Sequence, residues 1–127
     1  MKLTLKGLLE EMNITVQWQS EEESHVVPSF LGKGHFIFIN QQEPEELKPL
    51  TLLHEIGHIL IREVPECEDI SLWDEELLAW CVAQKLMHLL EWRIDRRFYS
   101  WALESLETYA PTEEHLQGAY MTLLEFI

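Results

Sequence analysis

The chain has few of the residues that build secreted or membrane-spanning proteins. Its 127 residues include only two cysteines, Cys67 and Cys81, which cannot form a disulfide framework and lack the Cys-x-x-Cys spacing of a closed zinc site. We therefore expect reduced thiols in a cytoplasmic protein. No segment approaches the roughly 18 consecutive apolar residues of a membrane-spanning helix. Residues 1–12 lack the apolar centre and cleavage site of a signal peptide.

Basic residues are also scarce. The sequence has 9 Lys and Arg against 23 Asp and Glu, a formal net charge of −14. A surface of this sign repels phosphate groups, so direct nucleic-acid binding is not expected. It would attract a basic protein partner, although strong charge also serves solubility alone. The length and the 46% apolar content suit a single domain, residues 1–127, with one core.

The spacing of apolar residues predicts an α+β fold, with a small sheet followed by a helical majority. A short helix is expected first, at 3–12. Alternating and apolar segments then predict about three strands in a mainly antiparallel sheet: 14–19, 26–30 and 35–40. Four helices should follow, at about 45–62, 72–91, 93–109 with a break near Asp95, and 112–126. Ser71, three residues before Asp74, resembles a capping box at the second of these helices.

One short motif carries the clearest chemistry. His54 and His58 are four residues apart in an apolar helical segment, so both imidazoles would face one side of a helix. They could bind one Zn²⁺ ion and leave positions for a third protein ligand and a water. Glu55 completes the pattern H-E-x-x-H and would act as a general base. Gly57 costs about 1 kcal/mol in a helix interior relative to Ala, which indicates that another segment comes close there.

The third ligand is expected on the helix that follows the motif. Adjacent helix positions are about 100° apart, so only one or two of its first acidic residues can face the metal. We favour Glu76, because Ala79 and Ala83 on the same face would allow a close approach to the motif helix. Glu75 remains the alternative. Asp74 is better explained as an acid that stabilises the helix N-terminus.

Other side chains are open alternatives for roles at the site. His88 is another possible third ligand, although it lies about three turns from Glu76. Enzymes of this kind commonly use a side chain to stabilise the transition state. Five residues could provide that side chain: Tyr99, Tyr109, Tyr120, His88 and His115.

Three segments together resemble the ImmA/IrrE-type metallopeptidases. A strand that ends in Asn, residues 36–40, precedes the motif helix at 51–60, and a later helix at 75–87 carries the candidate Glu ligands. The resemblance covers somewhat under half of the chain. In the family an Ala follows the Glu ligand, whereas none directly follows Glu75 or Glu76 here, so both residues stay open.

The resemblance implies a zincin-like fold and a zinc-dependent metallo-endopeptidase. His54, His58 and Glu76 would hold one zinc ion. Glu55 would take a proton from water and pass it to the leaving amine. The strand at 35–40 would be the edge strand above the metal, where an extended peptide substrate could pair.

The resemblance also implies a regulatory role. Members are often encoded by mobile elements, such as phages, and some cleave a repressor. The expected substrate is therefore a protein or peptide, such as a helix-turn-helix repressor, and no membrane partner is expected. The alternative is a catalytically silent metal-binding regulatory or inhibitor protein that acts by binding its partner.

Overall fold

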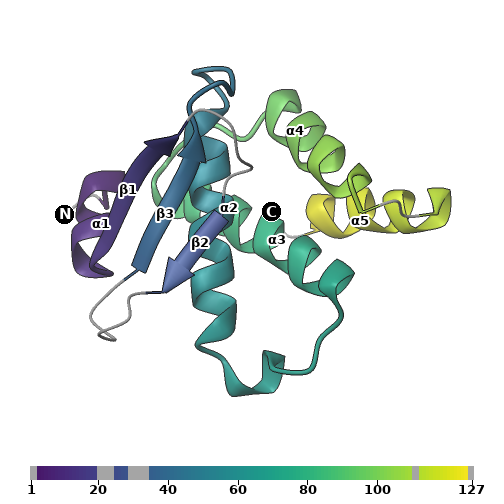
Figure 1. Ribbon diagram of the computed structural model, residues 1–127. Coiled ribbons are helices and arrows are strands. Elements are labelled where there is room, and N and C mark those ends of the chain that lie inside the picture. The colour runs from purple at the N-terminus through teal and green to yellow at the C-terminus, as the bar shows by residue number, and fades with distance from the viewer. Residues whose placement is uncertain (1–2, 20–24, 29–34, 110–111, 126–127) are drawn as a thin grey trace.

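Helices form most of the chain, and a small sheet precedes the four longest of them (Figure 1), which confirms the α+β class. The computed structural model describes residues 3–19, 25–28, 35–109 and 112–125. No helix in these ranges is long and apolar enough to cross a membrane. The elements are α1 (Leu5–Glu11), β1 (Ile14–Gln19), β2 (His25–Pro28), β3 (His35–Asn40), α2 (Lys48–Arg62), the 3₁₀ helix η1 (Pro65–Cys67), α3 (Leu72–Leu89), α4 (Arg96–Glu107) and α5 (Glu113–Glu125).

The sheet has the expected three strands, but the prediction of mainly antiparallel pairing was wrong. The strand order is β1-β3-β2. β1 runs parallel to β3 over six residue pairs, from Ile14↔His35 to Gln19↔Asn40, whereas β2 pairs antiparallel with β3 over four. In the sequence β2 lies between β1 and β3, but in the sheet β3 lies between β1 and β2. The central strand is therefore the last of the three in the chain.

β3 is the central strand, which corrects the expectation that residues 35–40 form an edge strand. Both of its neighbours hydrogen-bond to it. Ile37 and Ile39 are completely buried on one face of the strand. This burial is the physical reason for the central position, because apolar residues of an edge strand are less well covered. The two edges of the sheet are therefore β1 and β2.

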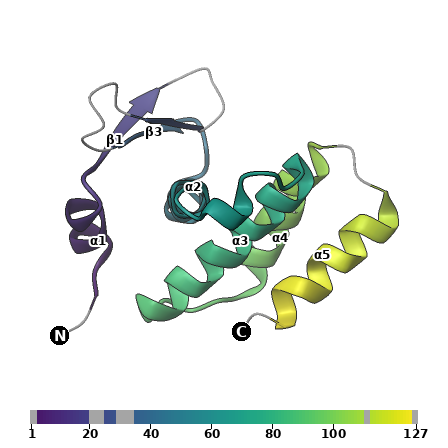
Figure 2. The same cartoon turned by 90° about the horizontal axis from the view of Figure 1, so that it is seen from below.

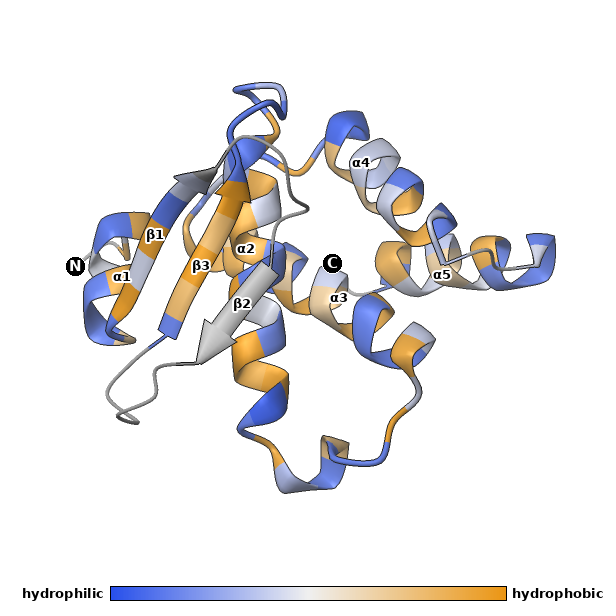
Figure 3. Ribbon diagram, in the orientation of Figure 1, coloured by the Kyte–Doolittle hydropathy of each residue, from blue (hydrophilic) through white to orange (hydrophobic). Residues whose placement is uncertain are grey.

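The motif helix α2 lies between the sheet and the other large helices. Seen along the sheet in Figure 2, the strands form one layer, α2 lies beneath it, and α3, α4 and α5 lie on the far side of α2. Figure 3 shows that the central strand and much of α2 are coloured as hydrophobic. Leu53, Ile56 and Ile59 of α2 are buried in the core. A helix in this position is apolar around most of its circumference.

Local sequence signals explain where the helices begin. Pro49 lies in the first turn of α2, where its missing N–H costs nothing, and the helix starts at Lys48 rather than near residue 45. The Ser71 hydroxyl accepts the Asp74 N–H (3.1 Å), as the capping pattern predicted. Asp95 caps α4 by accepting the Arg97 N–H (3.0 Å), so the break expected near Asp95 is the helix start itself.

Gly57 lies where α2 and α3 approach each other closely. A Cβ built on Gly57 would lie 2.6 Å from the carbonyl oxygen of Ala79, a backbone atom that cannot easily move away. Ala79 itself is completely buried. The expectation that another segment approaches Gly57 is confirmed, and the contact brings the motif helix and the helix bearing Glu76 together.

We expect Gly57→Ala to destabilise the fold although Ala normally favours helices. The clash with the Ala79 carbonyl should lower the free energy of unfolding by about 1–3 kcal/mol, as overpacking of a core usually does. Urea denaturation followed by circular dichroism measures this change. Gly118→Ala is the matched control, because a Cβ there meets nothing within 4 Å. The control should gain up to about 1 kcal/mol, and a gain of similar size for Gly57→Ala would contradict the packing argument.

Candidate metal centre

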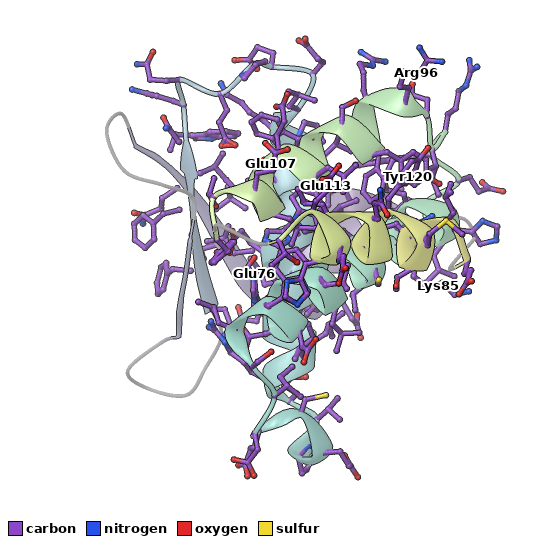
Figure 4. The ribbon with its side chains drawn as sticks, turned by 90° about the vertical axis from the view of Figure 1, so that its right-hand side faces the viewer. Glu76, Lys85, Arg96, Glu107, Glu113 and Tyr120 are labelled. Atoms are coloured by element: carbon purple, nitrogen blue, oxygen red, sulfur yellow. The ribbon has the colours of Figure 1, made fainter. Side chains whose placement is uncertain are left out.

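Three buried side chains from two helices converge on one point. α2 presents His54 and His58 one turn apart, and α3 presents Glu76 from the opposite side. His54 Nε2 lies 3.0 Å from one Glu76 oxygen, and His58 Nε2 lies 3.1 Å from the other. The two Nε2 atoms are 3.2 Å apart. Figure 4 shows Glu76 between the sheet and the C-terminal helices.

This arrangement fits a metal ion. Two imidazole nitrogens and a carboxylate oxygen around one tetrahedral zinc ion would be separated by about 3.4 Å, given metal–ligand distances near 2.1 Å. The two Nε2 atoms are 3.2 Å apart, close to that spacing, and each of them lies 3.0–3.1 Å from its own oxygen of the Glu76 carboxylate. Among the described residues, His54, His58 and Glu76 form the group of potential metal ligands whose ligand atoms all lie within 4.8 Å of one another. The group could therefore hold a metal ion.

Glu75 has a different position from Glu76. Its Oε2 lies 2.8 Å from Nδ1 of His58, on the side of the ring that faces away from the cluster. Arg62 approaches the same carboxylate, at 3.9 Å. A carboxylate that accepts the other N–H of a ligating His fixes the tautomer and orientation of the ring. The two glutamates therefore occupy different positions. Glu76 contacts the Nε2 atoms of both histidines, and Glu75 contacts only Nδ1 of His58.

Removing this support should weaken metal binding without abolishing it. We expect Glu75→Ala to lower zinc affinity about 10–100-fold, the usual cost of losing a carboxylate behind a ligating His. Competition with a chromophoric zinc chelator gives the affinity. Glu66→Ala, the same substitution in the exposed η1 segment, is the control and should bind zinc like wild type. Complete loss of zinc in Glu75→Ala would mean that Glu75 is itself a ligand.

His54 is held by packing against one face of its ring. The indole of Trp80 stacks on its ring, with centroids 4.2 Å apart and an interplanar angle of 18°. His54 Nδ1 is buried and finds no hydrogen-bond partner within the described part of the chain. Trp80 follows Glu76 by four residues, so α3 supplies a candidate ligand and the packing surface on one face. The sequence analysis did not name Trp80, although its spacing of four residues from Glu76 places both on one face of the helix.

The charge states of the cluster suit a cation. Burial is the main reason that the pKa of His54 lies below its usual value. Burial would raise the pKa of Glu76, but the hydrogen bonds with His54 and His58 hold it well below the usual range. Burial also lowers the pKa of His58, yet its hydrogen bond to Glu76 and the nearby carboxylates raise it by more. A metal at this point would therefore displace a proton from His58.

Glu55 lies beside the cluster without belonging to it. Its side chain is 6% exposed and, within the described residues, accepts no hydrogen bond. Burial raises the pKa of Glu55 to about 8. A carboxyl group whose pKa lies near neutrality can both accept and donate a proton at physiological pH, which is the property of a general acid–base catalyst.

The cluster lies in a cleft of about 580 Å³. One wall is α2, and α3 contributes Glu75, Glu76 and Trp80. The opposite wall is α4, from which the sequence analysis named Tyr99 but none of the residues that line the cleft. Its lining residues repeat at helical spacing, a pattern visible in the sequence: Trp101, Glu104, Ser105 and Thr108. The end of β3 and the loop after it add Asn40 and Glu43.

Most of the other candidates from the sequence lie elsewhere. His88, the further alternative for the third ligand, is exposed and outside the cluster. Tyr99 and Tyr120 contact each other, with ring centroids 5.9 Å apart, and His115 packs against Trp73. Of the five candidates for transition-state stabilisation, the cleft lining includes Tyr109 alone. Cys67 and Cys81 are free thiols, as expected.

Comparison with known proteins adds no relative. No family model matches the chain, and no curated protein or solved structure matches it. The resemblance to the ImmA/IrrE-type metallopeptidases therefore remains an interpretation of the motif and its surroundings. The functional argument rests on the residues of the cleft.

Proposed function

We propose that the chain is a zinc-dependent metallo-endopeptidase. The observation that carries the proposal is the convergence of His54, His58 and Glu76 at the floor of a cleft, with Glu55 beside them. Two nitrogen ligands and one carboxylate form a donor set that suits zinc. Three protein ligands, rather than four, leave a position open, which is the pattern of a catalytic site rather than a structural one.

The proposed mechanism assigns one role to each side chain. A zinc ion in the site would polarise the scissile carbonyl and make water more acidic. Glu55 takes a proton from the attacking water as the new C–O bond forms. It then delivers that proton to the leaving nitrogen as the C–N bond breaks, so that one water is consumed per peptide bond. Glu75 keeps His58 in its tautomer, and Trp80 keeps His54 in its orientation.

The substrate would bind as an extended strand along the sheet. Because β3 is central, an extended peptide would have to pair with an edge of the sheet, and β2, on the side of β3 away from β1, is the edge nearer α3 in Figure 1. A peptide that pairs with β2 would be held by main-chain hydrogen bonds that do not depend on its sequence. The proposal therefore moves the substrate-binding edge from residues 35–40 to residues 25–28.

We also propose that the physiological substrate is a protein partner in a regulatory system. The resemblance to the ImmA/IrrE-type metallopeptidases favours a helix-turn-helix repressor of a mobile element. Such a repressor is basic where it contacts DNA, and the net charge of −14 would attract it. A repressor that lost its DNA-binding segment by cleavage would release its operator.

The test is zinc-dependent cleavage of a random peptide library, read by mass spectrometry. The purified chain is loaded with one equivalent of zinc and compared with the same chain treated with a chelator. Cleavage that requires zinc supports the proposal. Metal binding without any cleavage would instead favour the catalytically silent regulatory protein, which acts by binding alone.

A further inference from the structure

A second cavity, of about 240 Å³, lies between the start of α2, the end of α3 and the start of α4. Among the described residues, none lines both this cavity and the cleft of the metal centre. Pockets for drug-sized molecules usually enclose about 300–1,000 Å³. The volume of the second cavity therefore suits a smaller ligand, of the size of a simple metabolite.

Apolar side chains form much of the second cavity. Leu50, Met87 and Phe98 line it, and each is at most 8% exposed. Trp92 adds its indole ring. The chain turns back after α3 at Glu91, which has a φ of 60°, and the Trp92 N–H donates to the Met87 carbonyl oxygen (2.8 Å). This is the Schellman motif of helix ends, and it fixes Trp92 beside Met87 whether or not a ligand is bound.

Charged side chains also line the second cavity, and two of them form a pair. Arg97 Nη2 lies 3.5 Å from Asp95 Oδ2. The other two, Glu46 and Arg93, make no hydrogen bond or ion pair with any residue in the described ranges, including each other. The cavity therefore offers a ligand one carboxylate and one guanidinium that the described structure leaves unpaired.

A ligand that suits this lining needs an apolar group and two opposite charges close together. A carboxylate could accept two hydrogen bonds from the planar guanidinium of Arg93. An ammonium group could donate to the carboxylate of Glu46. A ligand with a single charge would leave the other side chain without a partner. An α-amino acid with a hydrocarbon side chain carries all three groups, because its ammonium and carboxylate are attached to one carbon.

We propose that the second cavity binds a free apolar α-amino acid, such as leucine, in its zwitterionic form. The carboxylate of the ligand binds Arg93, and its ammonium group binds Glu46. Its hydrocarbon side chain packs against Leu50, Met87 and Trp92. Arg93 follows α3 and Glu46 precedes α2, so the site forms only when these distant segments are brought together by folding. The proposal does not depend on the peptidase function proposed above.

Isothermal titration calorimetry of the full-length chain tests the proposal with three probes. L-Leucine carries both charges, isoamylamine is leucine without its carboxylate, and 4-methylpentanoate is leucine without its ammonium group. We expect each analogue to bind about tenfold more weakly than leucine, the effect of losing one hydrogen bond to a charged group. Amino acids also bind zinc ions directly, so every titration is run on the zinc-loaded chain and on the chain treated with a chelator.

Two substitutions assign the charges of the ligand to side chains. Arg93→Gln should weaken leucine binding about tenfold and leave isoamylamine binding unchanged, since that probe has no carboxylate. Glu46→Gln should weaken leucine binding equally and leave 4-methylpentanoate binding unchanged. Arg96→Gln and Glu107→Gln make the same changes in charge at exposed residues outside the cavity lining, and both should bind all three probes like wild type (Figure 4).

The proposal would be overturned if leucine failed to bind at millimolar concentration, or if it bound only to the zinc-loaded chain. Binding of either analogue as tightly as leucine would also overturn it, because one charge would then suffice. An equal loss of affinity in the control variants Arg96→Gln and Glu107→Gln would do the same, because net charge alone would explain the effect. None of these results bears on the peptidase function, whose residues line the other cleft.

Discussion

Glu55→Gln should bind zinc like wild type and lose peptide hydrolysis. The amide has the shape of the carboxyl group but cannot take a proton from water. General acid–base catalysis contributes about 10²–10⁴-fold to such reactions, so kcat/KM should fall by that factor. The Glu55 side chain lies outside the group formed by His54, His58 and Glu76, and metal content should stay at the wild-type value. Peptide cleavage and zinc content, measured on the same preparation, provide the test.

The fold should tolerate this substitution. The Glu55 carboxyl is buried with a pKa raised to about 8, so the site already disfavours the charged form. A neutral amide of equal volume meets no new clash there. Circular dichroism and thermal unfolding serve as controls for an intact fold. Wild-type turnover in Glu55→Gln would exclude Glu55 as the base, and the mechanism proposed above would be wrong.

Glu76→Ala and His58→Ala should each lose the metal. If a zinc site gains about 10–16 kcal/mol from four ligands, each ligand contributes about 2.5–4 kcal/mol, and its removal weakens binding roughly 10²–10³-fold. Zinc at 100 times its Kd stabilises a folded protein by about 2.7 kcal/mol. Wild type should therefore unfold at a higher Tm with zinc than with chelator, whereas both variants should show no such shift. Elemental analysis after dialysis gives the stoichiometry, expected to be one zinc per chain.

Asp74→Ala is the matched control for these variants. Asp74 is an exposed acid in the first turn of the same helix, two residues before Glu76, and its side chain lies outside the cluster. It should keep full zinc content and the zinc-dependent rise in Tm. If Glu76→Ala retained zinc while Glu75→Ala lost it, the order of the two carboxylates would be reversed. If no variant changed the zinc content, the metal would have to bind elsewhere.

The candidate site could be predicted from the sequence where it depends on one helix. The spacing of His54 and His58 places both on one face whatever the rest of the fold does. The choice between Glu75 and Glu76 could not be predicted with the same certainty. It depends on the rotation of α3 against α2, which the contact of Gly57 with Ala79 sets. In the sequence, Gly57 indicated that another segment comes close, but nothing identified Ala79 as the residue that it contacts.

In the sheet, the position of the strand at 35–40 could be predicted from the sequence, but the pairing of the strands could not. The strand at 35–40 was predicted with its observed ends, because alternation and apolar content are local signals. Its pairing was not, because direction depends on how the connections cross the sheet rather than on any single strand. Six residues separate β2 from β3 in the sequence, whereas fifteen separate β1 from β3, so the parallel pairing of β1 with β3 could not be read from neighbouring segments. The residues of α4 that line the cleft were missed for a similar reason, since α4 joins the cleft from fifty residues away through the bond between Trp101 and Thr51.

The centre and the walls of the cleft belong to separable parts of the chain. His54, Glu55, His58 and both glutamates lie on the single helical hairpin of α2 and α3. The sheet edge and α4 contribute what surrounds them. Under the proposed function, sequence drift in the sheet edge or α4 would change which proteins are recognised while the hairpin kept its chemistry. A lineage that follows a changing partner would retain the hairpin and diversify its surroundings, and its members would resemble one another chiefly across residues 48–89.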